Sequence, residues 1–212
     1  MLCGFREREI KPDLVLFADT GAEMPHTYEH VELMRGKVRE WWGLKLEIVR
    51  KLYAGKFEGL EGECQRGDKL PALAYGSRAC SMKYKHEPQT RRIKAEMKSR
   101  GVNWYPLVEW EWWREECVAA ICRHGIPQPG KSSCYFCPAM KRSEVLRLKQ
   151  EHPELLARAL EIERKAQATI TSPRGLGGQN NRWADWLAMD AAQAKLMLDI
   201  EPHEIPCGCV DG

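Results

Sequence analysis

Residues 13–50 carry three kinds of hydrophobic pattern. Residues 14–18 are uniformly apolar, which is typical of a strand covered on both faces in a parallel sheet. Over residues 26–42 the apolar positions recur at helical spacing, and Gly43 follows as a helix end. Residues 44–48 alternate between apolar and polar, which predicts a second strand. Strand, helix and strand in this order predict a βαβ unit.

The patterns of the remaining residues predict mainly helices and loops. Residues 53–78 combine many glycines with mixed charges, which indicates a long loop with one short helix at 70–75. The stretch GIPQPGKSSCYFCP is expected to be irregular, because its prolines and glycines interrupt both regular structures. A short strand is predicted over 102–108. Helices are predicted over 90–100, 111–124, 143–151, 153–168 and 182–199.

These elements predict an α/β protein with a Rossmann-like open parallel sheet, flanking helices and a mostly helical C-terminal third. The length of 212 residues suits one sizeable domain with an appendage. We expect residues 1–140 to form the α/β domain and residues 141–212 to form a helical region with a cysteine-containing tail. No internal repeat is visible in the sequence.

Composition and charge narrow the protein class. The formal net charge of +3 is too small to indicate nucleic-acid binding by itself. No apolar stretch approaches the roughly 20 residues of a membrane span, and no signal-peptide core follows Met1, so we expect a soluble, cytoplasmic protein without membrane contact. Nine cysteines are an odd number, and the pair Cys134-x-x-Cys137 favours metal or redox chemistry over disulfides. The cysteines at 3, 64, 117 and 122 can instead pack as small apolar side chains.

The apolar run at 14–18 ends in Asp19-Thr20-Gly21, with Glu23 close behind. An aspartic protease would use an Asp-Thr-Gly loop, but it needs two such loops on an almost wholly β chain, and a helical pattern follows here. In open parallel sheets, ligands bind beyond the carboxyl ends of the strands, where a turn exposes amide groups, a hydroxyl and a carboxylate. We therefore predict nucleotide contacts from Asp19, Thr20, Gly21 and Glu23. The alternative is that Asp19 only caps a turn.

A second candidate segment is strongly basic. RACSMKYKHEPQTRR, residues 78–92, contains one acidic residue, Glu87, and six basic ones counting His86. Charge-assisted donors of this kind can hold a phosphate or sulfate. The predicted anion-binding residues are Arg78, Lys83 and Lys85. For Arg91 and Arg92 a solvated basic helix face is the alternative.

Three segments resemble the phosphoadenosine phosphosulfate (PAPS) reductase family of the adenine-nucleotide α-hydrolase-like superfamily. PDLVLFADTGAEMPHTYEHVELM is similar to the family's strand that ends in Asp-Thr-Gly and precedes a helix. CSMKYKHEP resembles Cys-Cys-x-x-Arg-Lys-x-Glu-Pro, and GKSSCYFCP resembles Gly-x-x-x-Cys-x-x-Cys. In the second motif Ser81 and Tyr84 depart, while the matching residues are Cys80, Lys85, Glu87 and Pro88. The resemblance covers roughly residues 1 to 150.

The resemblance implies a cofactor and a substrate. Family members that reduce adenosine phosphosulfate hold a 4Fe-4S cluster with the paired cysteines and the Cys-x-x-Cys, which implies Cys80, Cys134 and Cys137 as ligands. Because Ser81 occupies the second position of the pair, the fourth ligand would come from elsewhere in the chain. Cys209 is the expected fourth ligand, and Cys122 and Cys207 are the alternatives. Zinc is the alternative metal, and a redox or structural thiol pair is the alternative without metal. An adenylyl-sulfate-type nucleotide is the implied ligand.

The family also carries a nucleophilic cysteine in a C-terminal tail. Its thiolate attacks the sulfur of the activated sulfate, and a thiol reductant such as thioredoxin releases the product. The tail EIPCGCVDG makes Cys207 the corresponding residue, although no histidine follows it. As alternatives, Cys207 and Cys209 are metal ligands or a redox pair.

One family element is missing from the sequence. Members open with a strand and a Ser-Gly-Gly-Lys-Asp-Ser-type phosphate loop, whereas this sequence begins MLCGFREREIKPD. We therefore expect an N-terminally incomplete member that is inactive, less stable or bound to its ligand differently. The alternative functions are a metal-stabilised binding protein without catalysis and a sulfur-transfer enzyme acting on nucleic acid, to which EWEWW could contribute base stacking. A homo-oligomer is compatible with either function.

Overall fold

The first regular part of the fold is a βαβ unit. The computed structural model describes residues 1–56, 58–96 and 104–197, with side chains through residue 191. Strand β1 (Val15–Asp19) pairs in parallel with β2 (Leu46–Arg50). Helix α2 (Pro25–Trp42) connects them and ends at Gly43, which adopts the left-handed conformation at φ 68°. The predicted βαβ unit is confirmed.

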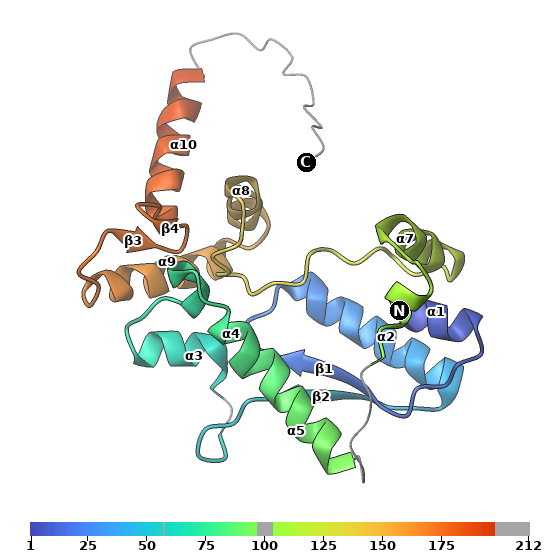
Figure 1. Cartoon of the computed structure of the whole chain (residues 1–212). Helices are drawn as coiled ribbons and strands as arrows, with labels where there is room; N and C mark the ends of the chain where they lie inside the picture. Colours follow the sequence, from blue (N-terminus) through green and yellow to red (C-terminus); the bar gives the residue numbers. More distant parts are fainter. Residues whose placement is uncertain (57, 97–103, 198–212) are drawn as a thin grey trace.

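The two strands lie between helices α2 and α5 (Glu87–Glu96) (Figure 1). On one face Val15 and Leu46 belong to an apolar cluster with Val38 of α2. On the other face Glu47 of β2 accepts a hydrogen bond from Arg92 of α5 at 2.7 Å. Alternate residues of a strand face opposite sides of a sheet, so β2 serves both layers. The chain is therefore mixed α/β, with the end of β1 enclosed between two helices.

The parallel sheet has two strands within the residues that the structure describes. The strand predicted over 102–108 is wrong for its second half, because Pro106–Glu109 forms the short helix α6. Pro106 occupies the first turn of that helix, where its missing amide hydrogen costs nothing. Residues 102 and 103 of the predicted strand lie outside the described residues.

Residues 59–96 contain more helix than the sequence predicts. Helix α3 (Gly59–Arg66) occupies what was expected to be loop, whereas the short helix predicted at 70–75 is confirmed as the 3₁₀ turn η1 (Ala72–Tyr75). The helix expected from residue 90 begins at residue 79, through α4 (Ala79–Ser81) and the π-helical turn η2 (Met82–His86) into α5. Single π turns in helices are frequent at functional sites.

The C-terminal third is helical, as predicted. Helices α8 (Arg142–Glu151) and α9 (Pro153–Gln167) flank His152, and the short hairpin β3 (Arg174–Gly175) with β4 (Gly178–Gln179) leads to α10 (Trp183–Met197). Two further helices, α1 (Leu2–Glu7) and α7 (Arg114–Arg123), contact each other (Figure 1). None of the helices in the described ranges is long and apolar enough to span a membrane.

One large apolar cluster joins the two predicted regions of the chain. It contains Ala22 and Tyr84 from the first region and Ile162 and Trp183 from the second. Within this cluster Glu163 is 2% exposed and accepts hydrogen bonds from the backbone amides of residues 176, 183 and 184 at 2.7, 2.9 and 3.0 Å. A buried carboxylate with three amide donors is satisfied without a counter-ion, so Glu163 anchors the hairpin and the start of α10 to α9.

Candidate functional site

Three segments that are far apart in the sequence meet where β1 ends. Asp19, Thr20 and Glu23, at the end of β1 and in the turn that follows, are 2, 2 and 3% exposed. Lys85, in η2, places its ammonium group 2.9 Å from Glu23 Oε1. Cys134, in the irregular segment between α7 and α8, places its sulfur 3.2 Å from Thr20 Oγ1. Residues of three sequence motifs therefore share one site at the carboxyl end of a parallel strand.

Asp19 is held through both oxygens of its carboxylate. Oδ1 accepts hydrogen bonds from the Gly21 amide at 2.7 Å and from the Tyr28 hydroxyl at 2.9 Å. Oδ2 accepts from Arg50 Nε at 2.9 Å. Gly21 has a φ of 78°, a conformation that favours glycine, so the turn after β1 is tight. Asp19 thus caps this turn and also ties α2 and β2 to the end of β1.

Tyr28 and Arg50 belong to the site but were not among the predicted residues. Burial, with the Asp19 carboxylate as the next cause, raises the pKa of the Tyr28 hydroxyl, which keeps it protonated as a donor. Arg50 is the partner of Asp19 in the parallel register of the two strands. Opposite charges at the last positions of two neighbouring parallel strands are therefore a signal that the sequence did contain.

The Glu23 side chain is wholly buried and surrounded by donors. Its Oε1 accepts a hydrogen bond from Thr20 Oγ1 at 3.1 Å and lies beside the Lys85 ammonium group. Its Oε2 accepts from Ser132 Oγ at 3.4 Å. Removing a carboxylate from water costs on the order of several kcal/mol unless charged and hydrogen-bonding partners replace the water. Glu23 has such partners on both of its oxygens. Glu23 is consequently the residue through which all three segments are connected.

Backbone hydrogen bonds hold the cysteine segment in place. Glu23 and Cys134 form an antiparallel bridge, and the Tyr135 amide donates to the Ala22 carbonyl at 2.9 Å. Burial, with Glu23 as the next cause, raises the pKa of the Cys134 thiol to about 12. Burial also raises the pKa of Cys137. Both thiols therefore stay protonated near neutral pH in this arrangement, and a thiol is a poor nucleophile.

The cysteines expected to bind a metal are only partly brought together. Cys134 belongs to the large apolar cluster, and Cys80 and Cys137 pack against it. Cys209, and the expected nucleophile Cys207, lie outside the described residues. Among the side chains that the structure describes, no three His, Cys, Asp or Glu residues are close enough to hold a metal ion. The 4Fe-4S cluster and zinc both stay predictions from the resemblance.

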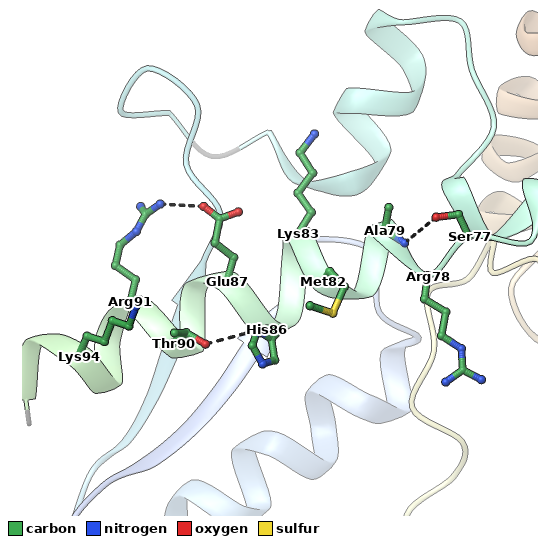
Figure 2. A pocket seen from close by; sticks show the side chains of 10 residues that line it. All are labelled: Ser77, Arg78, Ala79, Met82, Lys83, His86, Glu87, Thr90, Arg91 and Lys94. Carbon is green, nitrogen blue, oxygen red and sulfur yellow. Dashed lines mark hydrogen bonds and ion pairs between the residues drawn. The ribbon is translucent and has the colours of Figure 1, made fainter. Parts of the chain in front are cut away.

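The basic residues predicted to bind an anion lie on different sides of one helix. Figure 2 shows Lys83 and Arg78 pointing to opposite sides of it. Lys83 Nζ lies 2.8 Å from Glu63 Oε1 of α3, so its charge is already paired there. Lys85 pairs with Glu23 and is about a third exposed, at 34%. Arg78 is exposed and has no ion pair with any described residue.

Arg91 and Arg92 are engaged in ion pairs on the surface of α5. Arg91 Nη2 lies 3.0 Å from Glu87 Oε1 (Figure 2). Arg92 Nε lies 2.7 Å from Glu47 of β2, and its Nη1 lies 2.7 Å from a glutamate one turn later. These contacts favour the alternative in which both arginines serve the helix surface and its packing on the sheet.

A further carboxylate with several cationic partners, the partly buried Glu63, was not among the predicted residues. Lys69 and Lys83 each place an ammonium group 2.8 Å from its Oε1, and the Tyr84 hydroxyl donates to its Oε2. Burial acts to raise the pKa of Glu63, but the hydrogen bonds from Lys69, Lys83 and Tyr84 outweigh it and lower the pKa to about 2. Glu63 therefore fixes Lys83 on the side of the helix away from Glu23.

This low pKa predicts a pH dependence of stability. Because the pKa of Glu63 is about 2 in the folded chain against an ordinary 4.5, the unfolded chain takes up the proton first as pH falls. The stabilisation by Glu63 is thus complete above pH 4.5 and lost between there and pH 2. Urea unfolding at several pH values should show Glu63→Gln much less stable than the native chain at pH 6 and nearly equal to it at pH 2.

The matched control is Glu32→Gln, because Glu32 forms an exposed pair with Arg35 and its side chain is 62% exposed. Its difference from the native chain should be small at every pH. A difference in unfolding free energy between Glu63→Gln and the native chain that stays constant from pH 6 to pH 2.5 would contradict the low pKa assigned to Glu63.

A cavity of about 230 Å³ lies beside the site, between β1 and α2. Its walls are mainly apolar and include Val15, Phe17 and Val31, and Ser132 belongs both to this cavity and to the site. Thr27 also lines the cavity; its hydroxyl is buried and has no hydrogen-bond partner among the described residues. A buried hydroxyl without a partner costs roughly 1–3 kcal/mol, so a ligand atom that bonded it would be favoured.

Comparison with family models, with curated proteins and with solved structures finds no match for this chain. The assignment of function therefore depends on the sequence motifs and on the way their residues meet at the end of β1.

Proposed function

We propose that this chain binds an adenylyl nucleotide at the carboxyl end of β1 and reduces or transfers its activated sulfur group. The proposal combines the resemblance to the PAPS reductase family with one structural observation. Residues from all three resembling segments are linked there: Thr20 contacts both Glu23 and Cys134, and Lys85 pairs with Glu23. If the three resemblances were accidental, there would be no reason to expect their residues to contact one another in the fold. In this proposal the βαβ unit is the core of an open nucleotide-binding sheet.

The cavity between β1 and α2 is the proposed position of the adenine ring. Its volume of about 230 Å³ is below the roughly 300–1,000 Å³ of pockets that enclose whole ligands, so it would hold the base alone. Its apolar walls suit a flat aromatic ring, and the Thr27 hydroxyl can bond a ring nitrogen. Ser132, shared with the site, lies where the ribose and phosphate would leave the cavity.

Arg78 and Lys85 are the proposed anion-binding residues. Arg78 is exposed without an ion pair among described residues, and Lys85 keeps a third of its side chain in solvent. Lys83, by contrast, is held by Glu63 and is assigned no ligand contact. An anion held by a guanidinium and an ammonium group gains charge-assisted hydrogen bonds that discriminate a nucleotide from a nucleoside.

The sulfur step requires a thiolate that Cys134 and Cys137 do not supply, because burial raises the pKa of both thiols. We therefore keep Cys207 as the proposed nucleophile. Its thiolate would attack the sulfur of the adenylyl sulfate, the sulfur–oxygen bond to the phosphate would break, and AMP would leave. A dithiol such as thioredoxin would then release sulfite from the cysteine and be oxidised to its disulfide.

Calorimetric titration tests the binding half of the proposal. Adenosine 5′-phosphosulfate and AMP are expected to bind at one site per chain, and adenosine more weakly than either. Arg78→Ala should weaken binding of both nucleotides by about tenfold, the loss of one charge-assisted hydrogen bond. Lys94→Ala is the matched control, because Lys94 is an exposed cation of the same helix without an ion pair among the described residues (Figure 2).

Sulfite release from adenosine 5′-phosphosulfate in the presence of dithiothreitol tests the second half. Release that Cys207→Ser abolishes supports the enzyme. Binding without release supports the alternative of a non-catalytic binding protein, which the buried, protonated thiols also favour. No heat with any nucleotide at about 1 mM, the weak end of specific affinities, would contradict both.

A further inference from the structure

A surface formed around α6 exposes several large apolar side chains and shares no residue with the site at the end of β1. Trp104, Tyr105, Val108 and Trp113 are 47, 65, 77 and 76% exposed. Single exposed apolar residues are common on protein surfaces. Several of them grouped within a ten-residue segment are typical of an interaction surface. These four residues are called the aromatic surface below.

Stacked side chains and a hollow adjoin the aromatic surface. The Arg8 guanidinium lies 4.2 Å from the ring centre of Trp110 and 4.8 Å from that of Trp112. Phe5 stacks on Trp104 with ring centres 5.7 Å apart. A hollow of about 630 Å³ is lined by Leu107, Val108, Glu111, Trp112 and Trp113. Because the Trp104 ring is already packed on Phe5, a partner would lose little binding energy to ordering that ring.

Acidic side chains predominate in the segment that carries this surface. Within the described residues 104–116 the one cation is Arg114, and the Arg8 guanidinium lies over the rings of Trp110 and Trp112. The exposed carboxylates of the segment outnumber these cations, and none of them forms an ion pair with a described residue. They are Glu109, Glu111, Glu115 and Glu116. The segment therefore combines exposed apolar side chains with a net negative charge.

We propose that the aromatic surface binds a cationic peptide segment of a partner protein, in which arginine or lysine side chains alternate with apolar ones. The exposed faces of Trp104 and Trp113 attract such cations, the hollow formed by α6 and the turn after it receives an apolar side chain, and the glutamates pair with the remaining charge. Nucleic acid is disfavoured at this surface: its bases could stack on Trp113, but its phosphates would be repelled by the same glutamates.

Fluorescence anisotropy with the full chain tests the proposal. The probe is a fluorescein-labelled dodecapeptide in which arginine and lysine alternate with leucine and serine. Its affinity should fall as NaCl is raised from about 50 to 300 mM, because the glutamate charges are screened. Trp113→Ala should weaken binding roughly tenfold, as expected for a central aromatic contact. Glu115→Gln combined with Glu109→Gln should weaken it by about threefold to tenfold.

The controls separate this surface from general stickiness. Tyr75→Ala removes another exposed aromatic side chain, 47% exposed but outside this surface, and should leave the affinity unchanged. A peptide with glutamate in place of arginine and lysine should not bind. Circular dichroism should show that Trp113→Ala is folded, because that side chain is 76% exposed.

Four results would overturn the proposal. One is equal affinity of Trp113→Ala and the native chain for the cationic peptide. Another is binding of a twelve-nucleotide oligothymidylate in preference to the peptide. The third is a dimer, measured by light scattering, that Trp113→Ala dissociates, because the surface would then be covered by a second copy of the chain. The last is no peptide binding at about 200 µM, a concentration above that of most specific peptide complexes.

Discussion

Glu163→Ala is expected to lower the free energy of unfolding by about 4 kcal/mol, the largest loss of any single substitution considered for this chain. The Glu163 carboxylate accepts hydrogen bonds from the backbone amides of Leu176, Trp183 and Ala184. The substitution leaves these buried or partly buried donors without an acceptor. It also removes a negative charge from the N-terminus of α10, where the helix dipole favours one.

The measurement is urea unfolding followed by circular dichroism. Glu163→Gln should lose about half as much stability, because the amide keeps one acceptor oxygen but presents a second donor to the backbone amides. Glu161→Ala, on the same helix but paired with Arg164 on the surface, is the control and should be nearly neutral. If Glu163→Ala were as stable as Glu161→Ala, the anchoring role of the carboxylate would be wrong.

Local patterns were sufficient to predict the βαβ unit and the C-terminal helices. In both, the apolar residues that define the pattern also face the core, as with Val38 of α2 and Ile162 of α9, which are 0 and 1% exposed. Helix α3 gave no such signal, because its segment contains two glycines and few apolar residues. It is stabilised by tertiary packing, since Leu60 and Cys64, one turn apart, are both buried in the large cluster.

The error at 102–108 has a different cause. Aromatic and β-branched residues such as Trp104, Tyr105 and Val108 are typical of strands, and they led to that prediction. In the structure these three side chains are among the most exposed apolar ones of the chain, and Pro106 begins a helix. Strand propensity reflects how a side chain packs on a pleated surface, and among the described residues no strand lies beside this segment to provide that packing.

At the site, the sequence identified residues better than it identified their partners. Asp19, Thr20 and Glu23 do lie together at the end of β1, but their polar atoms bond one another and residues of other elements. Lys83 and Lys85 are two positions apart and pair with different glutamates on different sides. Such pairings join residues more than a dozen positions apart, so they depend on tertiary packing that no local pattern contains.

Lys85→Met is expected to lower the free energy of unfolding by about 3 kcal/mol and to abolish nucleotide binding. Lys85 is the cation beside the Glu23 carboxylate, whose side chain is 0% exposed. After the substitution, only the hydroxyls of Thr20 and Ser132 remain to stabilise that buried charge. Glu23→Gln should cost less, because the released Lys85, a third exposed already, can turn its ammonium group to water.

The double variant shows whether Lys85→Met destabilises the chain by breaking the ion pair with Glu23 or by removing other contacts of Lys85. If Lys85→Met destabilises by leaving a buried charge unpaired, adding Glu23→Gln to it should recover most of the stability, with a coupling of roughly 2 kcal/mol in the double-mutant cycle. Lys37→Met, which breaks the exposed pair with Glu40, is the control and should change stability little. Additive losses in the cycle would show that Glu23 and Lys85 do not act as a pair. A double variant that is stable but binds no nucleotide, while Glu23→Gln alone still binds it, would instead place Lys85 at the ligand, because the fold would then be intact while the cation facing the phosphate was missing.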